Sequence, residues 1–172
     1  MAVRNPDNVN IWVDANVYVS TVAPVIPATV DAVMGITWNL VGILDGNAGF
    51  DDNRKWKENM NFGWGIGLIK VSHSQFEMDR TFTAMEDNPV MQSLVNPGST
   101  DTLRKVPLPA YVYLAFESFA DTGKVERLFT RRKAQVWAEK QKRSEADVTS
   151  SAFACKIFAD SAQVLFDRQA TA

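Results

Sequence analysis

The sequence has one cysteine, Cys155, and one histidine, His73, in 172 residues. A lone cysteine excludes an intramolecular disulfide, so the fold does not depend on an oxidising compartment and we expect assembly in the cytoplasm. A lone histidine leaves little for a histidine-based metal site or catalytic triad. We interpret Cys155 as a small buried hydrophobic residue and His73 as a residue at a strand end.

An excess of basic charge and long hydrophobic runs are also missing. Eighteen Lys and Arg residues stand against 20 Asp and Glu residues, for a net charge of -2. This balance argues against a basic surface covering the whole domain, which a nucleic-acid-binding protein would need. No stretch reaches the roughly 18 apolar residues that span a bilayer, and residues 1–10 lack the apolar core of a signal peptide. We therefore expect neither membrane insertion nor secretion.

Motifs that carry catalysis are absent from the sequence. It contains no phosphate-binding loop, dinucleotide fingerprint or zinc-ligand spacing. The glycines of "GWGIG", residues 63–67, are more typical of a bend in a strand. The neighbouring carboxylates Asp51 and Asp52 could bind a cation, but a solvated loop is the better explanation for them. We expect no enzyme activity and no cofactor or metal.

Alternating apolar residues predict that most of the chain forms β-strands. The expected strands are residues 9–20, 36–44, 64–72, 74–84, 110–119, 124–140, 148–160 and 162–169. Two prolines in residues 21–33 predict a surface connection, and "ADTG" at 120–123 predicts a tight turn. Residues 131–146 also have helical propensity and could be a strand or a second helix. The pattern predicts a mainly β domain over residues 1–172, as a β-sandwich or partly closed barrel with a short helix packed on the sheet.

That helix is predicted in "FTAMEDNPVMQSLVNPG", residues 82–98. Asn88 can cap the free amide groups of the first turn, and Pro89 at the first helical position loses no hydrogen bond. The apolar stripe Val90, Met91, Leu94 and Val95 follows, and "NPG" at 96–98 ends the helix. About two turns of helix do not persist alone in water, so we expect the stripe to dock on the sheet.

Residues 45–65 form a polar segment that we interpret as a long exposed loop or an extended hairpin. It carries Phe50, Trp56, Phe62 and Trp64, a heavy aromatic load for such a polar stretch. Folding back onto the core explains one or two of these side chains more easily than all four, so we expect the others to meet a partner.

The predicted strand 74–84 has two different faces. Phe76, Met78 and Phe82 share one face with Arg80. The opposite face is polar throughout and must meet water; it consists of Gln75, Glu77, Asp79, Thr81 and Thr83.

The order of these segments resembles the major tail tube protein of long-tailed, non-contractile bacteriophages, particularly those of actinobacterial hosts. The resemblance rests on "WVDANVYV", "WNLVGILDGNAGF", "FTAMEDNPVMQSLV" and "ADSAQVLFDRQ", and on the run F-x-x-x-E-x-N at Phe82, Glu86 and Asn88. It implies a virion protein whose hexameric rings stack into a tube that conducts DNA, assembled with a tape measure protein and with tail terminator and tip proteins. The basic, helix-prone stretch 131–147 departs from the family pattern.

The resemblance also implies roles for individual residues. The long loop would contact the neighbouring ring through Asp45, Asn47, Phe50, Asp51, Asp52, Arg54, Lys55 and Trp56. A lumen that conducts DNA should be polar to acidic, because each phosphate paired with Lys or Arg steepens the log–log salt dependence of binding by about one unit. The face Gln75, Glu77, Asp79, Thr81 and Thr83 is our candidate for the lumen, although it could equally be the outer solvent surface.

Two other functions fit the same sequence. One is a monomeric β-sandwich that binds carbohydrate or decorates a virion, with Trp12, Trp56 and Trp64 stacking on sugars. The other is a secreted tube protein of a phage-derived injection machine, which would share the tube architecture.

Overall fold

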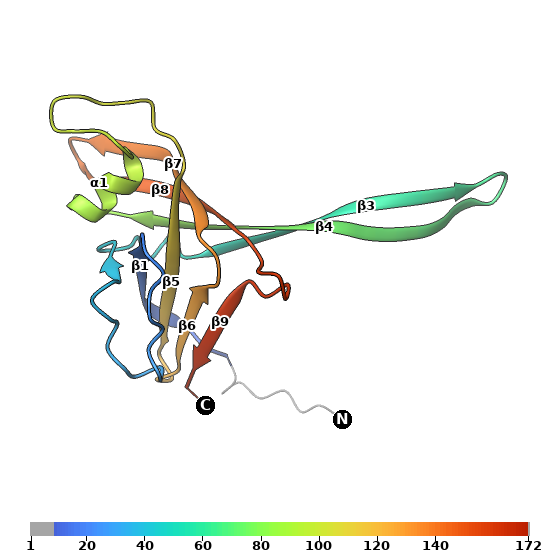
Figure 1. The fold of residues 1–172 in the computed structure, drawn as a ribbon, viewed down its shortest axis with the longest axis horizontal. Helices are drawn as coiled ribbons and strands as arrows, with labels where there is room; N and C mark the ends of the chain where they lie inside the picture. Colours follow the sequence, from blue (N-terminus) through green and yellow to red (C-terminus); the bar gives the residue numbers. More distant parts are fainter. Residues whose placement is uncertain (1–8, 172) are drawn as a thin grey trace.

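The structure, a computed structural model, describes residues 9–171, so most of the N-terminal segment examined for a signal peptide lies outside it. The described residues form antiparallel strands and one short helix, as predicted (Figure 1). The elements are β1 (Trp12–Ser20), β2 (Asn39–Leu40), β3 (Asp51–Gly63), β4 (Gly67–Ala84), α1 (Pro89–Val95), β5 (Ala110–Ala120), β6 (Val125–Thr130), β7 (Ala134–Ser144), β8 (Asp147–Ile157) and β9 (Phe166–Ala170).

Strand β5 joins two sheets that enclose the core. Its first residues, Ala110–Val112, pair with β7, and the remainder pairs with β1 on one side and β6 on the other. One sheet therefore has the order β2-β1-β5-β6-β9, and the other has the order β5-β7-β8-β4-β3. Because β5 belongs to both sheets, the continuous sheet folds over on itself and its two halves face each other across the core.

Residues 39–45 narrow the gap between the two free edges of this folded sheet. The Val41 amide donates to the Val17 carbonyl in β1 (2.8 Å), and the Asp45 amide donates to the Thr83 carbonyl in β4 (2.9 Å). Leu44 forms an isolated bridge with Ala84. The predicted mainly β fold with one short helix is confirmed. Of the two architectures left open, this segment favours the partly closed barrel over the sandwich, because it contacts β1 at one end and β4 at the other.

The predicted strand over residues 36–44 is wrong in extent, because only Asn39–Leu40 is regular strand. Gly42 interrupts it with a φ of 117°, in the left-handed half of backbone space that favours glycine. A Cβ at this position would lie 2.6 Å from Glu86 Oε2, so the chain before the helix crowds the segment as well. The strand therefore stops where the backbone must turn toward β4.

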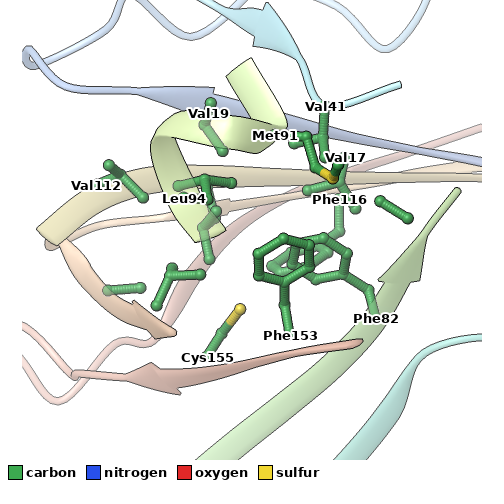
Figure 2. Packing of buried hydrophobic residues seen from close by; sticks show 14 of the residues in the cluster. Val17, Val19, Val41, Phe82, Met91, Leu94, Val112, Phe116, Phe153 and Cys155 are labelled. Carbon is green, nitrogen blue, oxygen red and sulfur yellow. The ribbon is translucent and has the colours of Figure 1, made fainter. Parts of the chain in front are cut away.

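Aromatic and aliphatic side chains from both sheets and the helix fill the core (Figure 2). Phe82 stacks on Phe153 with ring centroids 5.0 Å apart, and Met91 and Leu94 of α1 cover this cluster. Cys155 is fully buried, as predicted, and burial raises the pKa of its thiol, which makes it an unreactive packing residue.

The helix cap is confirmed atom by atom. Asn88 Oδ1 accepts a hydrogen bond from the Met91 amide (2.8 Å), and Pro89 is in the first turn. Asn88 Nδ2 donates to the Val41 carbonyl (2.7 Å). The same side chain therefore starts the helix and fixes it to the segment that narrows the barrel, which places the apolar stripe on the core.

The remaining sequence predictions need two corrections, and one alternative that the sequence left open is resolved. The predicted strand 124–140 is two strands, β6 and β7, because the chain bends at Arg131 and Arg132. Residues 131–146 contain β7 rather than a helix, since β7 pairs with both β5 and β8 and buries Ala134 and Val136 completely. Residues 64–72 and 74–84 are not two strands but one, β4, so His73 lies inside a strand and not at its end.

A buried ion pair holds the predicted surface connection against the sheet. Arg127 Nε donates to Glu117 Oε1 (2.5 Å), and Arg127 Nη1 donates to the Ala32 carbonyl (2.7 Å). Glu117 also accepts hydrogen bonds from Asn16 and Tyr18, and burial raises the pKa of Tyr18. These hydrogen bonds give the buried charges of Arg127 and Glu117 partners, and without partners such charges would destabilise the fold.

Candidate functional site

The distal parts of β3 and β4 project from the body as a two-stranded arm (Figure 1). Strand β8 pairs with β4 only from Met78 to Ala84. Beyond that point β3 and β4 pair with each other alone. We call residues 53–76 the arm. The sequence alternative of an extended hairpin is confirmed, although its strands begin and end later than residues 45–65.

The arm has one apolar face and one polar face, because residues opposite each other on paired strands point to the same side. The register pairs Met60 with Val71 and Phe62 with Leu68, and Trp56 packs on Phe76 with ring centroids 4.7 Å apart. These residues define the apolar face. The opposite side pairs Asn59 with Ser72, Asn61 with Lys70 and Lys57 with Ser74, and it defines the polar face.

A bulge in β4 keeps the apolar residues on one side. Val71 and His73 lie at odd positions and Phe76 and Met78 at even positions, so a regular strand would put them on opposite faces. Between the pairs Lys55–Glu77 and Lys57–Ser74, β4 contains one residue more than β3. Gln75 lies in this stretch and adopts a φ of 52°. The extra residue reverses the alternation and extends the core-facing side of the sheet into the apolar face of the arm.

Nothing in residues 9–171 covers the apolar face. Phe62 is 68% exposed, and Trp64 in the turn at the end of the arm is 102% exposed. A ribbon of only two strands is marginally stable in water, and exposed apolar patches usually mark interaction sites. Of the four aromatics noted in the sequence, only Phe50 packs against the core cluster, which agrees with the expectation that folding back would explain one or two.

The single histidine lies on this face of the arm. His73 Nε2 is 3.5 Å from Glu58 Oε1, and both side chains are half exposed. The two residues are directly opposite each other in the β3–β4 register. They are the only polar pair between the Trp56–Phe76 and Met60–Val71 contacts, so a partner that covers the apolar face would also cover them.

The base of the arm is fixed to the core by Arg80. Its Nε and Nη2 donate to the two carboxylate oxygens of Asp52, at 2.5 and 2.8 Å. The guanidinium also lies over the rings of Phe50, Phe116 and Phe166, at 4.6 to 5.6 Å from their centroids. A paired and stacked arginine of this kind holds the hairpin in one direction relative to the body.

The polar face continues from the arm onto the body. Asp79, Thr81 and Thr83 are half buried on the side of β4 that faces away from the core, and Glu77 is exposed. Lys156 Nζ donates to Glu77 Oε2 (3.0 Å), and this hydrogen bond lowers the pKa of Glu77 and raises that of Lys156. The predicted polar face is present, with Gln75 at the bulge.

The residues proposed for contacts between rings divide into two groups. Asp45 and Asn47 form a turn on the body, where the Asn47 amide donates to Asp45 Oδ1, and Asp51 and Asp52 start β3 beside them. Arg54, Lys55 and Trp56 lie on the near part of the arm. Sequence reasoning placed Leu68 and Val71 in an ordinary strand and did not single out Met60, although all three belong to the apolar face.

Residues 9–171 contain neither a cluster of metal-ligating side chains nor a helix that could span a membrane. Among the described residues, no three His, Cys, Asp or Glu side chains are grouped so as to hold a metal ion. The helix present is too short and insufficiently apolar to cross a membrane, and residues 9–171 contain no other candidate span.

Comparisons with known proteins find similarity in structure but not in sequence. No protein-family model matches the chain, and no curated protein matches it. Among solved structures, the chain is similar to a chain of the sheath-tube complex of an extracellular contractile injection system (PVC) in its extended state. That similarity has a TM-score of 0.41 at 8% identity and covers 91% of this chain and 88% of the other. At this level of similarity, function has to be derived from the chain's own geometry.

Proposed function

We propose that this protein is a self-assembling structural subunit whose copies form hexameric rings that stack into a tail tube. The observation that carries the proposal is the amphipathic arm. Nothing in residues 9–171 covers its apolar face. A second copy of the chain is a partner that is always present at the right stoichiometry. The resemblance to phage tail tube proteins in segment order supports the same function.

Open strand edges give further support. Strand β3 pairs only with β4, and β9 pairs only with β6, so each leaves one edge unpaired in the described fold. Unpaired edges invite pairing with another chain, and natural monomers usually block them. A contact between two different surfaces of identical copies closes into a ring or continues as a filament, depending on the rotation it imposes.

In this role the polar side of β4 would line the lumen. Glu77, Asp79, Thr81 and Thr83 offer carboxylates and hydroxyls. Two cations lie beside them: Lys156 donates to Glu77, and Lys55 is opposite Glu77 on β3. A surface whose cations are matched by carboxylates would bind passing DNA only weakly. The tube would be built in the host cytoplasm on a tape measure protein, joined to terminator and tip proteins, and carried in the virion.

A carbohydrate-binding monomer has weaker support. Trp56 and Trp64 are eight positions apart on the arm, roughly 26 Å along an extended strand, and Trp12 lies on β1 in the body. Sugar-binding surfaces of this type need aromatic rings close enough to stack on neighbouring units of one chain. The three indoles do not form such a platform.

Electron microscopy of the purified protein at increasing concentration tests the proposal. We expect rings or tubes from the wild type and monomers from the variant Met60→Ser/Phe62→Ser, which removes apolar side chains from the exposed face. The matched control, Asn59→Ser/Asn61→Ser, changes the same strand on its polar face and should assemble like the wild type. A wild-type protein that remains monomeric at every concentration, or that binds glycans as a monomer, would overturn the proposal.

A further inference from the structure

A groove on the body has the features of a receptor for the arm. It has a volume of about 740 Å³ and lies between the first half of β1 and the segment 40–50. Its apolar lining includes Trp12, Val13, Leu40, Ile43 and Phe50. All of these except Phe50 are exposed, so the groove is a second apolar surface without a cover in the described chain.

The groove follows a strand edge that has no partner strand in residues 9–171. Strand β2 pairs with β1 only at Tyr18 and Val19, which leaves the edge of Trp12–Asn16 open. The Ala15 amide donates to the Asp14 side chain (2.8 Å), a local substitute for a bond to a neighbouring strand. This is the place where the barrel remains incomplete, and a β-ribbon from another chain would fit along it.

Charge distinguishes the groove from the arm. Carboxylates dominate the charged lining of the groove. Asp14, Asp45 and Glu86 have no ion-pair partner among the described residues, whereas Glu126 is paired with Arg168 and the one cation in the lining, Arg80, is bound to Asp52. The far half of the arm, residues 57–73, carries the opposite excess, although the whole chain is slightly acidic. Lys57 and Lys70 stand there against the single carboxylate Glu58.

We propose that the far half of the arm, residues 57–73, binds in this groove on another copy of the chain. The proposal rests on the proposed function, and it names the surface that receives the arm. The apolar face packs on Trp12, Leu40 and Ile43, and the long side chains of Lys57 and Lys70 reach the acidic rim from the polar face.

This contact has a direction, because the arm and the groove are different surfaces of one chain. Each copy can give one arm and receive one, so the contact is head-to-tail and repeats from copy to copy. It would protect both exposed apolar surfaces at once, and opposite charges would select this docking over arm-to-arm association.

Cross-linking tests the placement of the arm in assembled protein. One preparation carries Trp64→Cys and the other carries Val13→Cys, and the two are mixed, assembled and treated with a short bis-maleimide. The native Cys155 is fully buried and does not compete. We expect cross-linked dimers from this mixture and none when Val13→Cys is replaced by Val148→Cys, an exposed residue outside the groove.

Charge exchange provides a second, independent test. The arm variant Lys57→Glu/Lys70→Glu and the rim variant Asp14→Lys/Asp45→Lys should each raise the concentration needed for assembly by about tenfold. Combining the two variants should restore assembly, whereas combining the arm variant with Asp31→Lys/Asp101→Lys, at exposed sites outside the groove, should not. Thermal unfolding of each unassembled variant verifies that the body is folded.

The outcomes separate this inference from the proposed function. Tubes that form without arm-to-groove cross-links, and without rescue by the charge exchange, would overturn the groove assignment and leave the tube function standing. A wild-type protein that forms no assembly at all would overturn both.

Discussion

Arg80 and Asp52 form a two-bond ion pair where the arm leaves the body, with Nε–Oδ1 and Nη2–Oδ2 distances of 2.5 and 2.8 Å. The Arg80 side chain is 8% exposed and Asp52 is 26% exposed, so water reaches only one partner. The pair therefore fixes the orientation of the exposed arm relative to the packed core.

Removing Asp52 should be costly, because it leaves a buried guanidinium without a counter-charge. We expect Asp52→Ala to lower the free energy of unfolding by about 3 kcal/mol. Arg54 lies 3.8 Å from the same carboxylate but is mostly exposed, so Arg54→Ala should cost about 1 kcal/mol or less. Denaturant unfolding of unassembled protein measures both, and equal costs for the two variants would contradict the anchoring role of Arg80.

Asn88 should contribute more than an ordinary helix cap. Its side chain accepts from the Met91 amide and donates to the Val41 carbonyl, so Asn88→Ala removes two bonds. We expect a loss of about 2 kcal/mol in the free energy of unfolding, at the upper end for caps. The control is Ser93→Ala on the exposed side of the same helix, with a change of about 0.5 kcal/mol or less. A similar loss in both variants would contradict this assignment.

Deleting Gln75 alone should leave assembly intact, whereas deleting Ser74 and Gln75 together should abolish it while the body stays folded. The single deletion removes only the extra residue of the bulge, so a regular strand keeps Val71 and His73 on the same side as Phe76. The double deletion removes one residue more, which turns Val71 and His73 to the polar side and breaks the apolar face. Electron microscopy gives the assembly readout, and normal tubes from the double-deletion variant would contradict the role of the apolar face.

Reversing charge on the polar side of β4 should impair DNA passage without preventing tube formation. The variant Glu77→Lys/Asp79→Lys adds cations in every copy of every ring, so phosphates would be attracted along the tube. The control, Glu77→Lys with Lys156→Glu, exchanges the members of an existing ion pair and leaves the net charge unchanged. Infectivity of phage carrying these tubes provides the measurement, and unchanged infectivity of the reversal variant would count against a lumen at this face.

Local sequence patterns predicted the elements whose structure depends on neighbours in the chain. The Asn88–Pro89 start, the two-turn helix and the turn at 120–123 all depend on residues a few positions apart. The alternation Met78, Arg80, Phe82 likewise predicted a face that the structure buries. Periodicity was sufficient in these cases because one core lies against one side of each element.

The misses occurred where long-range contacts decide the structure. Residues 131–146 were left open between strand and helix, and pairing with β5 and β8 on either side of β7 outweighs their helical propensity. The strand expected over 36–44 is limited by Gly42 and by the approach of Glu86 from more than 40 positions away. The continuous strand β4 appeared as two because the Gln75 bulge shifts the alternation, and only the partner strand reveals the extra residue.

The candidate site was predictable in part. The aromatic excess in residues 45–65 indicated a surface that needs a partner, and Trp56, Phe62 and Trp64 are exposed on the arm. The apolar contributions of Leu68 and Val71 could not be assigned, because their side of the ribbon depends on the β3–β4 register. The groove combines β1 with residues from distant segments, so no local pattern could have indicated it.

Amide hydrogen exchange of β3, compared between dilute unassembled protein and assembled protein, tests the central claim most directly. We expect fast exchange over residues 53–63 in the unassembled chain, because this ribbon has few buried contacts, and protection by at least about a hundredfold after assembly. If the arm exchanges equally fast in both states, copies of the chain do not cover it, and the account is contradicted.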